Sequence, residues 1–227
     1  MKEIRTITVD LDDTLWEIYP VIRRAEQRLR DWLEQHYPRI TEMFALEDIA
    51  EVRARVLEMH ADMAYDLTFV RRTLLTEMAT AAGYNKFLVD DAFAVFEEAR
   101  NDVKVFPEVR PALRALRERY TLIAVTNGNA NLHKIGIADL FDDHVNAAAV
   151  GAAKPDRPIF DAAVQAGGAS AAATLHVGDH PLYDVHGARE AGLRTVWVNR
   201  NDAAWPEEFA VPDIEVRNVG ELHEHLL

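Results

Sequence analysis

Two patterns of hydrophobic and polar residues divide the chain. From Val105 onward, short apolar runs alternate with stretches whose apolar residues recur every three or four positions. Between Trp16 and about Arg100 glycine is almost absent, and apolar residues recur only at the helical spacing. The first pattern is typical of alternating strands and helices, and the second predicts four or so amphipathic helices.

The alternating part predicts a parallel sheet. An apolar strand that ends at Asp10 opens the chain, and strands separated by helices of this length form βαβ units. The fold class expected is therefore α/β, a doubly wound parallel sheet of residues 1–15 and 102–227, with an all-α domain inserted at residues 16–101. Further strands are expected at Tyr120–Val125, near His144–Val150, and at Ala173–Val177, Thr195–Val198 and Ile214–Val216. Helices are expected at Pro107–Arg119, Asn129–Ile137, Asp156–Ala166, about Tyr183–Ala191 and Glu221–Leu227.

Composition narrows the chemistry. The 227 residues include no cysteine, which excludes disulfides, zinc–thiolate sites and a cysteine nucleophile. Ser170, the only serine, follows a helical stretch rather than a strand, so serine-hydrolase chemistry is excluded as well. The 38 acidic residues outnumber the 25 basic ones and give a net charge of −13, which disfavours a nucleic-acid surface.

Hydropathy bears on where the protein works. No apolar run approaches the roughly 18 residues that a membrane helix needs, and the chain enters its first strand without a signal-peptide segment. A cytoplasmic protein with neither a membrane nor a nucleic acid as its partner is therefore expected. Its acidic balance still permits a phosphorylated small molecule, provided that cations or a metal are present locally.

Polar side chains collect where the predicted strands end. In an open parallel sheet, ligands bind outside the carboxyl ends of the strands, so these residues are expected to lie close together. Three strand ends that each deliver acidic or hydroxyl groups indicate a site more strongly than any one motif does. The candidates are Asp10 and Asp12 after the first strand, Thr126, Asn127 and Gly128 after the second, Lys154 before a helix, and Asp179 and Asp184 after the strand that ends at Val177.

Each motif also has a purely structural interpretation. DLDDT could cap a helix, but it does not fit a calcium loop, because Leu15 and Val21 stand where such a loop needs Gly and Glu. TNGN could form a hairpin turn, Lys154 could be a solvated surface lysine, and GDHPLYD could be an ordinary strand-to-helix turn. Within DLDDT, Asp13 and Thr14 are expected only to hold the turn. The four motifs together, in this order, are better explained by a common site.

These motifs resemble those of a known superfamily. DLDDT, TNG at 126–128, KP at 154–155 and GDHPLYD resemble the four motifs of the haloacid dehalogenase superfamily, and the helical insert resembles its small cap domain. The resemblance spans nearly the whole chain and implies a Rossmann-like core. PVIRRAE, VTNGNA, and LHVGD with DVHGAREAG are similar to the flavin mononucleotide phosphatase branch. His180-Pro181 departs from the small or acidic residues that commonly follow the last motif's first aspartate.

The resemblance implies a Mg²⁺-dependent phosphomonoester hydrolase. It makes Asp10 the nucleophile that forms an aspartyl-phosphate, and Asp12 the acid that protonates the leaving oxygen and then the base that activates water. Thr126 and Lys154 would hold the transferring phosphoryl group. The ligands implied for Mg²⁺ are the carboxylates of Asp10 and Asp179 and the backbone carbonyl of Asp12. Asp184 would support these ligands without binding the ion directly.

Substrate recognition is expected to involve the insert. Trp16, Tyr19 and Arg71 are expected near the mouth of the site, although Arg71 could instead be a solvated helix charge, and Asn127 and Gly128 would help to position the substrate. An aromatic or cationic lining suits a flat ring on a ribityl chain. The small phosphorylated metabolite expected is therefore flavin mononucleotide or a related riboflavin-pathway phosphate. Nothing in the sequence indicates the oligomeric state.

Other activities stay open. Dehalogenation has no leaving oxygen to protonate, and dehalogenases of the superfamily typically lack an acid at the position of Asp12, so a phosphatase is favoured. A phosphomutase keeps both acids and remains an alternative. A phospho-accepting signalling receiver also combines aspartates, Mg²⁺, Thr and Lys, but its acceptor aspartate lies in the middle of the chain rather than at Asp10.

Overall fold

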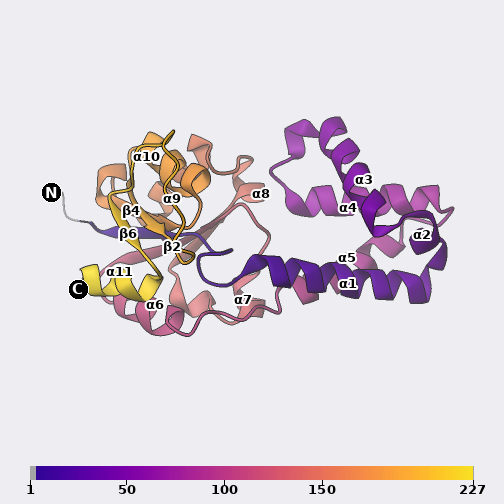
Figure 1. Cartoon of the computed structure of the whole chain (residues 1–227), viewed down its shortest axis with the longest axis horizontal. Helices are drawn as coiled ribbons and strands as arrows, with labels where there is room; N and C mark the ends of the chain where they lie inside the picture. Colours follow the sequence, from indigo (N-terminus) through magenta and orange to yellow (C-terminus); the bar gives the residue numbers. More distant parts are fainter. Residues whose placement is uncertain (1–3, 227) are drawn as a thin grey trace. The chain divides into compact units, whose positions relative to one another are not determined.

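The computed structural model of the chain describes residues 4–226. The chain divides into two compact units, one formed by Met1–Glu17 with Lys104–Leu227 and the other by Ile18–Val103. We call the first the sheet unit and the second the helical unit, and each is described by itself (Figure 1).

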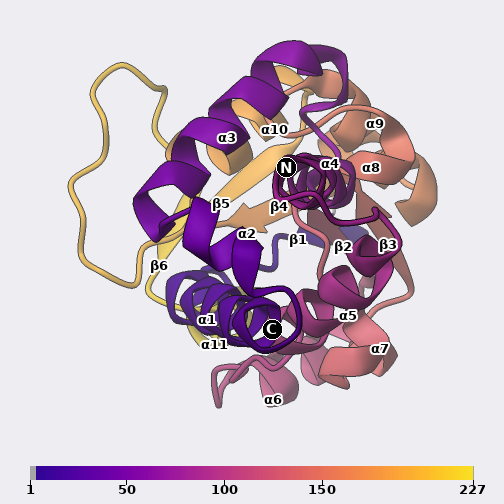
Figure 2. The same cartoon turned by 90° about the vertical axis from the view of Figure 1, so that its right-hand side faces the viewer.

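The sheet unit is a parallel sheet between two layers of helices, as the sequence predicts. Helices α9 and α10 cover one face of the sheet, and α6 and α11 cover the other (Figures 1 and 2). The strands lie in the order β3-β2-β1-β4-β5-β6, and all their pairings are parallel. They are β1 (Thr6–Val9), β2 (Thr121–Thr126), β3 (Asp143–Asn146), β4 (Thr174–Gly178), β5 (Arg194–Val198) and β6 (Ile214–Val216). The helices are α6 (Val109–Arg117), α7 (Leu132–Ile135), η2 (Ala138–Leu140), α8 (Ala147–Val150), α9 (Arg157–Gly167), η3 (Ala171–Ala173), η4 (Pro181–His186), α10 (Gly187–Glu190) and α11 (Val219–Leu226).

The strand order creates a place for a ligand. The chain adds β2 and β3 on one side of β1, and β4, β5 and β6 on the other. Ligands of open α/β sheets bind at the carboxyl ends of the strands where the order reverses in this way. The strands on either side of that point, β1 and β4, are the ones followed by Asp10 and Asp179.

The strand expected near His144–Val150 is confirmed only in its first half. Residues 143–146 form β3, but Ala147–Val150, expected to continue it, form the short helix α8. The side chain of Asn146 accepts the N–H of Ala149 at 2.9 Å and so caps a helix at this point. Gly151 ends that helix in the left-handed conformation, with φ of 80°.

The helix expected at Asn129–Ile137 is shorter than predicted. Its first helical residue is Leu132, because the side chain of Asn131 accepts two backbone N–H groups and acts as the N-cap. Gly136, with φ of 77°, ends it. The other expected elements agree more closely, since Tyr120–Val125 corresponds to β2, Ala173–Val177 to β4, Thr195–Val198 to β5, Ile214–Val216 to β6, Pro107–Arg119 to α6, Asp156–Ala166 to α9 and Glu221–Leu227 to α11, where Leu227 lies outside the described residues.

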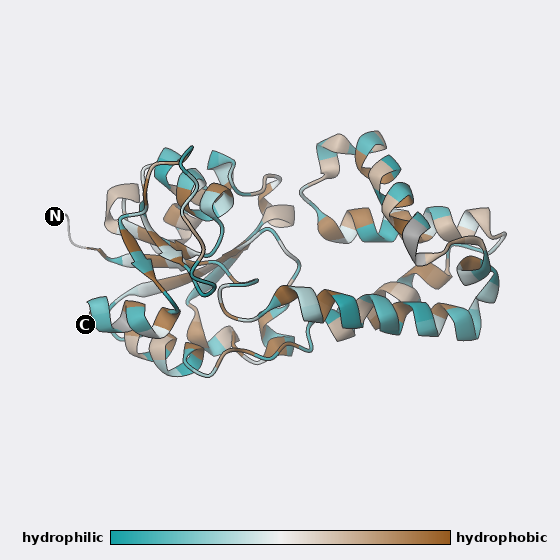
Figure 3. Cartoon of the chain, viewed as in Figure 1, coloured by the Kyte–Doolittle hydropathy of each residue, from teal (hydrophilic) through white to brown (hydrophobic). Residues whose placement is uncertain are grey.

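The helical unit is all-α, as its spacing of apolar residues predicts. The stripes of brown and teal in Figure 3 display the alternation of apolar and polar positions along its helices. Its core is formed by apolar residues of α1, α2, α3, α4 and α5, such as Leu29, Leu74 and Phe96. Within residues 4–226 no helix is long and apolar enough to cross a membrane. The elements of this unit are α1 (Ile18–His36), α2 (Pro38–Met43), α3 (Leu46–Met59), η1 (Ala61–Met63), α4 (Leu67–Ala81) and α5 (Leu88–Arg100).

Candidate functional site

The loop after β1 folds back tightly on itself. The backbone N–H of Asp10 donates to Val177 at 2.8 Å, so the loop leaves the sheet beside the end of β4. Asp13 adopts φ of 61°, a conformation that Asp tolerates better than most residues, and its N–H donates to the carbonyl of Trp16 at 2.8 Å. The turn holds Asp10 in the interior, where it is 6% exposed.

Three carboxylates meet at the carboxyl ends of β1 and β4. Oxygen atoms of Asp10, Asp179 and Asp184 all lie within 4.8 Å of one another. The hydroxyl of Thr14 is 3.2 Å from Oδ2 of Asp10 and 3.3 Å from Oδ1 of Asp179, and so links two of them. The carbonyl of Asp179 accepts the indole N–H of Trp197 at 2.8 Å, which fixes the loop from the side of β5.

A π-helical turn brings Asp184 into this cluster. The helix expected from Tyr183 begins earlier, because Pro181–His186 form a π-helical turn whose N-cap is the ring of His180. The backbone N–H of His180 donates to Oδ2 of Asp184 at 2.9 Å and so holds this carboxylate. A Cβ on Gly178 would lie 2.2 Å from Cγ of Asp184, so this approach requires glycine.

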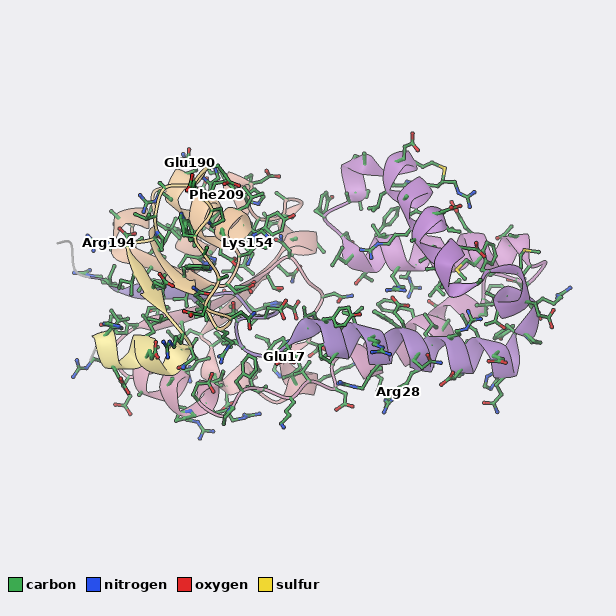
Figure 4. All side chains as sticks on the ribbon, in the orientation of Figure 1. Glu17, Arg28, Lys154, Glu190, Arg194 and Phe209 are labelled. Carbon is green, nitrogen blue, oxygen red and sulfur yellow. The ribbon has the colours of Figure 1, made fainter. Side chains whose placement is uncertain are left out.

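Lys154 is a buried member of the cluster rather than a solvated surface lysine. It is 4% exposed, and its Nζ lies 2.5 Å from Oδ1 of Asp10 and 2.6 Å from Oδ1 of Asp184. The side chain of Asn127 brackets its backbone, donating to the carbonyl at 2.9 Å and accepting the N–H at 2.6 Å. Figure 4 labels Lys154 among the side chains of the sheet unit.

Burial and charge shift the ionisation of all four groups. Burial raises the pKa of Asp10 well above its ordinary value, and the charge of Lys154 offsets only part of this. Burial and the charge of Asp184 raise the pKa of Asp179 to about 7. For Asp184, burial is outweighed by the charge of Lys154, which lowers its pKa below the ordinary range. For Lys154, burial is outweighed by the charges of Asp10 and Asp184, which hold its pKa above the ordinary range.

The cluster fits a divalent cation. Three carboxylates and one ammonium leave two negative charges without compensation when all four groups are ionised. Such a surplus in a buried site is costly unless a cation balances it. Carboxylate oxygens are the ligands that Mg²⁺ prefers. Asp10, Asp179 and Asp184 are therefore the residues that could hold the ion.

Thr126 ends β2 and is buried. Its hydroxyl accepts the N–H of Gly128 at 2.8 Å, which closes the turn after the strand. Because Gly128 gives its N–H to this turn and Asn127 gives its amide to Lys154, both residues shape the site in this structure. Their contact with a substrate stays a prediction.

Trp16 is buried and forms a hydrogen bond with Asp12. Its side chain is fully buried, and its indole N–H donates to Oδ1 of Asp12 at 2.9 Å. The expected contact of this ring with a substrate stays a prediction. Asp12 itself is partly exposed, two residues after the buried Asp10.

The two other predicted substrate residues belong to the helical unit. Arg71 pairs with Glu26 through two hydrogen bonds, and its guanidinium lies 4.0 Å from the ring centroid of Phe96. Its side chain is 13% exposed, so it is not a solvated helix charge. Tyr19 is 75% exposed. The part of both residues in substrate choice stays a prediction.

Two residues of the cluster are not found by the sequence reasoning. Thr14 is expected there only to hold its turn, yet it contacts two carboxylates. His176 lies within the apolar strand β4, and its Nε2 is 3.2 Å from Oδ1 of Asp184. The sequence does contain a signal for His176, because it is a polar residue inside an apolar run, three residues before the candidate metal ligand Asp179.

Comparison with known proteins gives consistent matches over most of the chain. A family model described as haloacid dehalogenase-like hydrolase matches residues 4–192. The 5-amino-6-(5-phospho-D-ribitylamino)uracil phosphatase YigB of Escherichia coli (strain K12) is 27% identical, over 98% of this chain and 96% of its own. The phosphoserine phosphatase of Thermus thermophilus is 30% identical, over 96% of this chain and 98% of its own. The crystal structure of a 2-haloacid dehalogenase from Pseudomonas syringae pv. Tomato DC3000 superposes with a TM-score of 0.94 at 38% identity and covers 98% of both chains.

Proposed function

Because the chain belongs to the haloacid dehalogenase-like hydrolase family, we propose that it is a Mg²⁺-dependent phosphatase of small phosphomonoesters. The observation that carries the proposal is the cluster of Asp10, Asp179 and Asp184, whose oxygen atoms lie within 4.8 Å of one another beside Lys154. A phosphomonoester is an anion, and the ionised carboxylates of this cluster would repel it unless a divalent cation compensated their charge. A cation and a phosphoryl group therefore explain the cluster together.

The cation would be held by residues of the sheet unit. The carboxylates of Asp10 and Asp179 and the backbone carbonyl of Asp12 would hold Mg²⁺, with Asp184 supporting them. When bound, Mg²⁺ supplies positive charge that attracts the phosphate and offsets the charge that develops during transfer.

Asp10 would act as the nucleophile. One of its oxygens attacks phosphorus, the bond between phosphorus and the leaving oxygen breaks, and an aspartyl-phosphate forms. Asp12 gives its proton to the leaving oxygen and then takes a proton from the water that attacks the aspartyl-phosphate, which releases phosphate and restores Asp10. The bond from Trp16 to Oδ1 of Asp12 holds this carboxyl group in place.

Thr126 and Lys154 would hold the phosphoryl group. The hydroxyl of Thr126 accepts from Gly128, so its own hydrogen is available to a phosphoryl oxygen. Lys154 lies against Asp10 and carries a compact charge, which suits it to stabilise the transferring group. Both residues are buried, and the low local dielectric strengthens such contacts.

The finer part of the proposal is the substrate. The name of YigB describes it as a phosphatase that acts on a ribitylamino-uracil phosphate, and it aligns over 98% of this chain. We expect flavin mononucleotide or a related riboflavin-pathway phosphate among the better substrates. The aromatic and cationic side chains of Tyr19 and Arg71 are candidates for contact with its ring.

Dehalogenation is the second candidate, since a 2-haloacid dehalogenase superposes closely. A haloacid has no phosphoryl group for a divalent cation and Lys154 to stabilise, so dehalogenation leaves the carboxylate cluster unexplained. The carboxyl group of Asp12 would also have no leaving oxygen to protonate.

A single screen tests these candidates. Phosphate release is measured with Mg²⁺ from flavin mononucleotide, the ribitylamino-uracil phosphate, phosphoserine and p-nitrophenyl phosphate, and halide release is measured from chloroacetate and 2-chloropropionate. We expect phosphate release that excess EDTA abolishes and added Mg²⁺ restores. Halide release without phosphate release would contradict the proposal, and so would full phosphatase activity in excess EDTA. Hydrolysis of the generic ester but not of the ribityl phosphates would contradict only its substrate part.

The acid role of Asp12 has its own test. Asp12→Asn removes the proton donor, so it should slow hydrolysis of alkyl phosphates, which have poor leaving groups, roughly 10²- to 10⁴-fold. Hydrolysis of p-nitrophenyl phosphate should fall much less, because nitrophenolate leaves without a proton. The measurement is kcat on both substrates, and equal losses would contradict an acid role.

A further inference from the structure

A buried histidine lies behind the three carboxylates. His176 on β4 is 1% exposed, and its Nε2 is 3.2 Å from Oδ1 of Asp184. Its Nδ1 is 2.7 Å from the hydroxyl of Thr8, the residue that it faces in register on β1. The ring of Phe160 on α9 meets the imidazole edge to face, with centroids 5.2 Å apart. Each ring nitrogen therefore has a polar partner, and packing fixes the plane of the ring.

The chemistry of the partners fixes the direction of both hydrogen bonds. An ionised carboxylate can only accept, so the hydrogen between His176 and Asp184 belongs to Nε2. A neutral imidazole with its hydrogen on Nε2 leaves Nδ1 as an acceptor. The hydroxyl of Thr8 consequently donates to Nδ1 and selects the Nε2–H form of the ring.

This arrangement limits how Asp184 can serve the site. Its Oδ1 accepts from two donors, Nε2 of His176 and Nζ of Lys154, and its Oδ2 accepts the N–H of His180. With two donors on Oδ1, a cation can reach this carboxylate only through Oδ2 or through a bridging water. The orientation of the whole carboxylate thus depends on the hydrogen bond that Nε2 of His176 donates to it.

We propose that His176 is a positioning residue that orients Asp184 for the cation and for Lys154, and that Thr8 sets the hydrogen of its ring. This inference rests on the proposed function, because it assumes that a divalent cation binds at Asp10, Asp179 and Asp184. It goes further by assigning a role to two buried residues, on β1 and β4, to which the proposed mechanism gives none. Removal of such outer partners typically weakens metal binding by about 10- to 100-fold.

Two substitutions at one position separate this role from simple packing. In His176→Gln the amide nitrogen reaches the place of Nε2 and can still donate to Asp184. In His176→Asn the shorter amide reaches only the place of Nδ1 and loses that bond. Calorimetric titration with MgCl₂ in the absence of substrate should give a dissociation constant at least about tenfold higher for Asn than for wild type, and within about threefold of wild type for Gln.

The hydrogen on the ring can be observed directly. In ¹⁵N-labelled protein, long-range proton–nitrogen NMR should find the hydrogen of His176 on Nε2. Thr8→Val keeps the shape of the side chain but lacks the hydroxyl, so it should shift the ring toward the Nδ1–H form and weaken Mg²⁺ binding by several-fold. Thr8→Ser, which keeps the hydroxyl, should behave like wild type.

The outcomes are distinguishable. Equal dissociation constants for wild type, His176→Gln and His176→Asn would overturn the proposal, and so would a hydrogen on Nδ1 in the wild-type ring. If His176→Asn does not fold, the comparison of Thr8→Val with Thr8→Ser tests the proposal instead. Equal Mg²⁺ affinity for these two variants would overturn the proposal. A protein that binds Mg²⁺ in the expected order but releases no phosphate from any ester would contradict the proposed function and leave this inference standing. An absence of Mg²⁺ binding by the wild type would overturn both.

Discussion

Asp10→Asn should reduce phosphate release more than 10³-fold without weakening the fold. The amide has the shape of the carboxylate and can still accept from Lys154, but it is a poor nucleophile and a weaker metal ligand. Because burial disfavours the charge of Asp10, the neutral amide should leave the melting temperature unchanged or raise it. The measurements are kcat with saturating Mg²⁺ and thermal unfolding followed by circular dichroism.

A matched control lies three residues away. Asp13 is exposed, and its φ of 61° is one that Asn also adopts readily, so Asp13→Asn makes the same chemical change in the same loop. Its activity should stay within about threefold of wild type, as expected for an exposed residue without a catalytic role, although its charge acts on Asp179. Activity of Asp10→Asn within tenfold of wild type would remove Asp10 from the role of nucleophile.

Lys154→Met should damage both activity and stability. Methionine fills much of the same volume but leaves Asp10 and Asp184 buried without their shared cation. Breaking a buried ion pair by removing one partner costs about 3–5 kcal/mol of the free energy of unfolding. Without the positive charge of Lys154 to stabilise the transferring phosphoryl group, kcat should fall by about 10²- to 10³-fold.

Added Mg²⁺ separates the two effects. If Asp10 and Asp184 face the cation, saturating Mg²⁺ should restore part of the stability that Lys154→Met loses, whereas kcat should stay low. Lys134→Met, at an exposed position, is the control and should change the free energy of unfolding by no more than about 0.5 kcal/mol. Wild-type stability of Lys154→Met in EDTA would show that the ion pairs of Lys154 contribute nothing.

The fold could be predicted where the hydrophobic pattern is regular. The apolar runs that become β1, β2 and β4 mark three strand ends, and the parallel order places those ends at one edge of the sheet. The error at residues 147–150 has a local cause. Small alanines fit a strand or a helix, and the capping bond of Asn146 decides between the two.

The residues behind the site are harder to predict, because their role depends on contacts between distant parts of the chain. His176 and Thr8 are 168 residues apart in sequence and meet only through the register of β1 with β4. Trp16 follows the polar loop after β1, where a surface aromatic is expected, but a tight turn folds its ring inward onto Asp12. A sequence indicates which side chains could react, whereas the partners of each side chain follow from strand register and turn geometry.

The two indole hydrogen bonds at the site give the protein an optical property. Trp16 donates to the carboxyl group of Asp12, and Trp197 donates to the carbonyl of Asp179 and packs edge to face against Trp205. Indole emission responds to the charge and mobility of the group that accepts its hydrogen. Two of the four tryptophans in the chain are therefore attached to the two loops that surround the carboxylates, and the protein carries its own fluorescent reporters there.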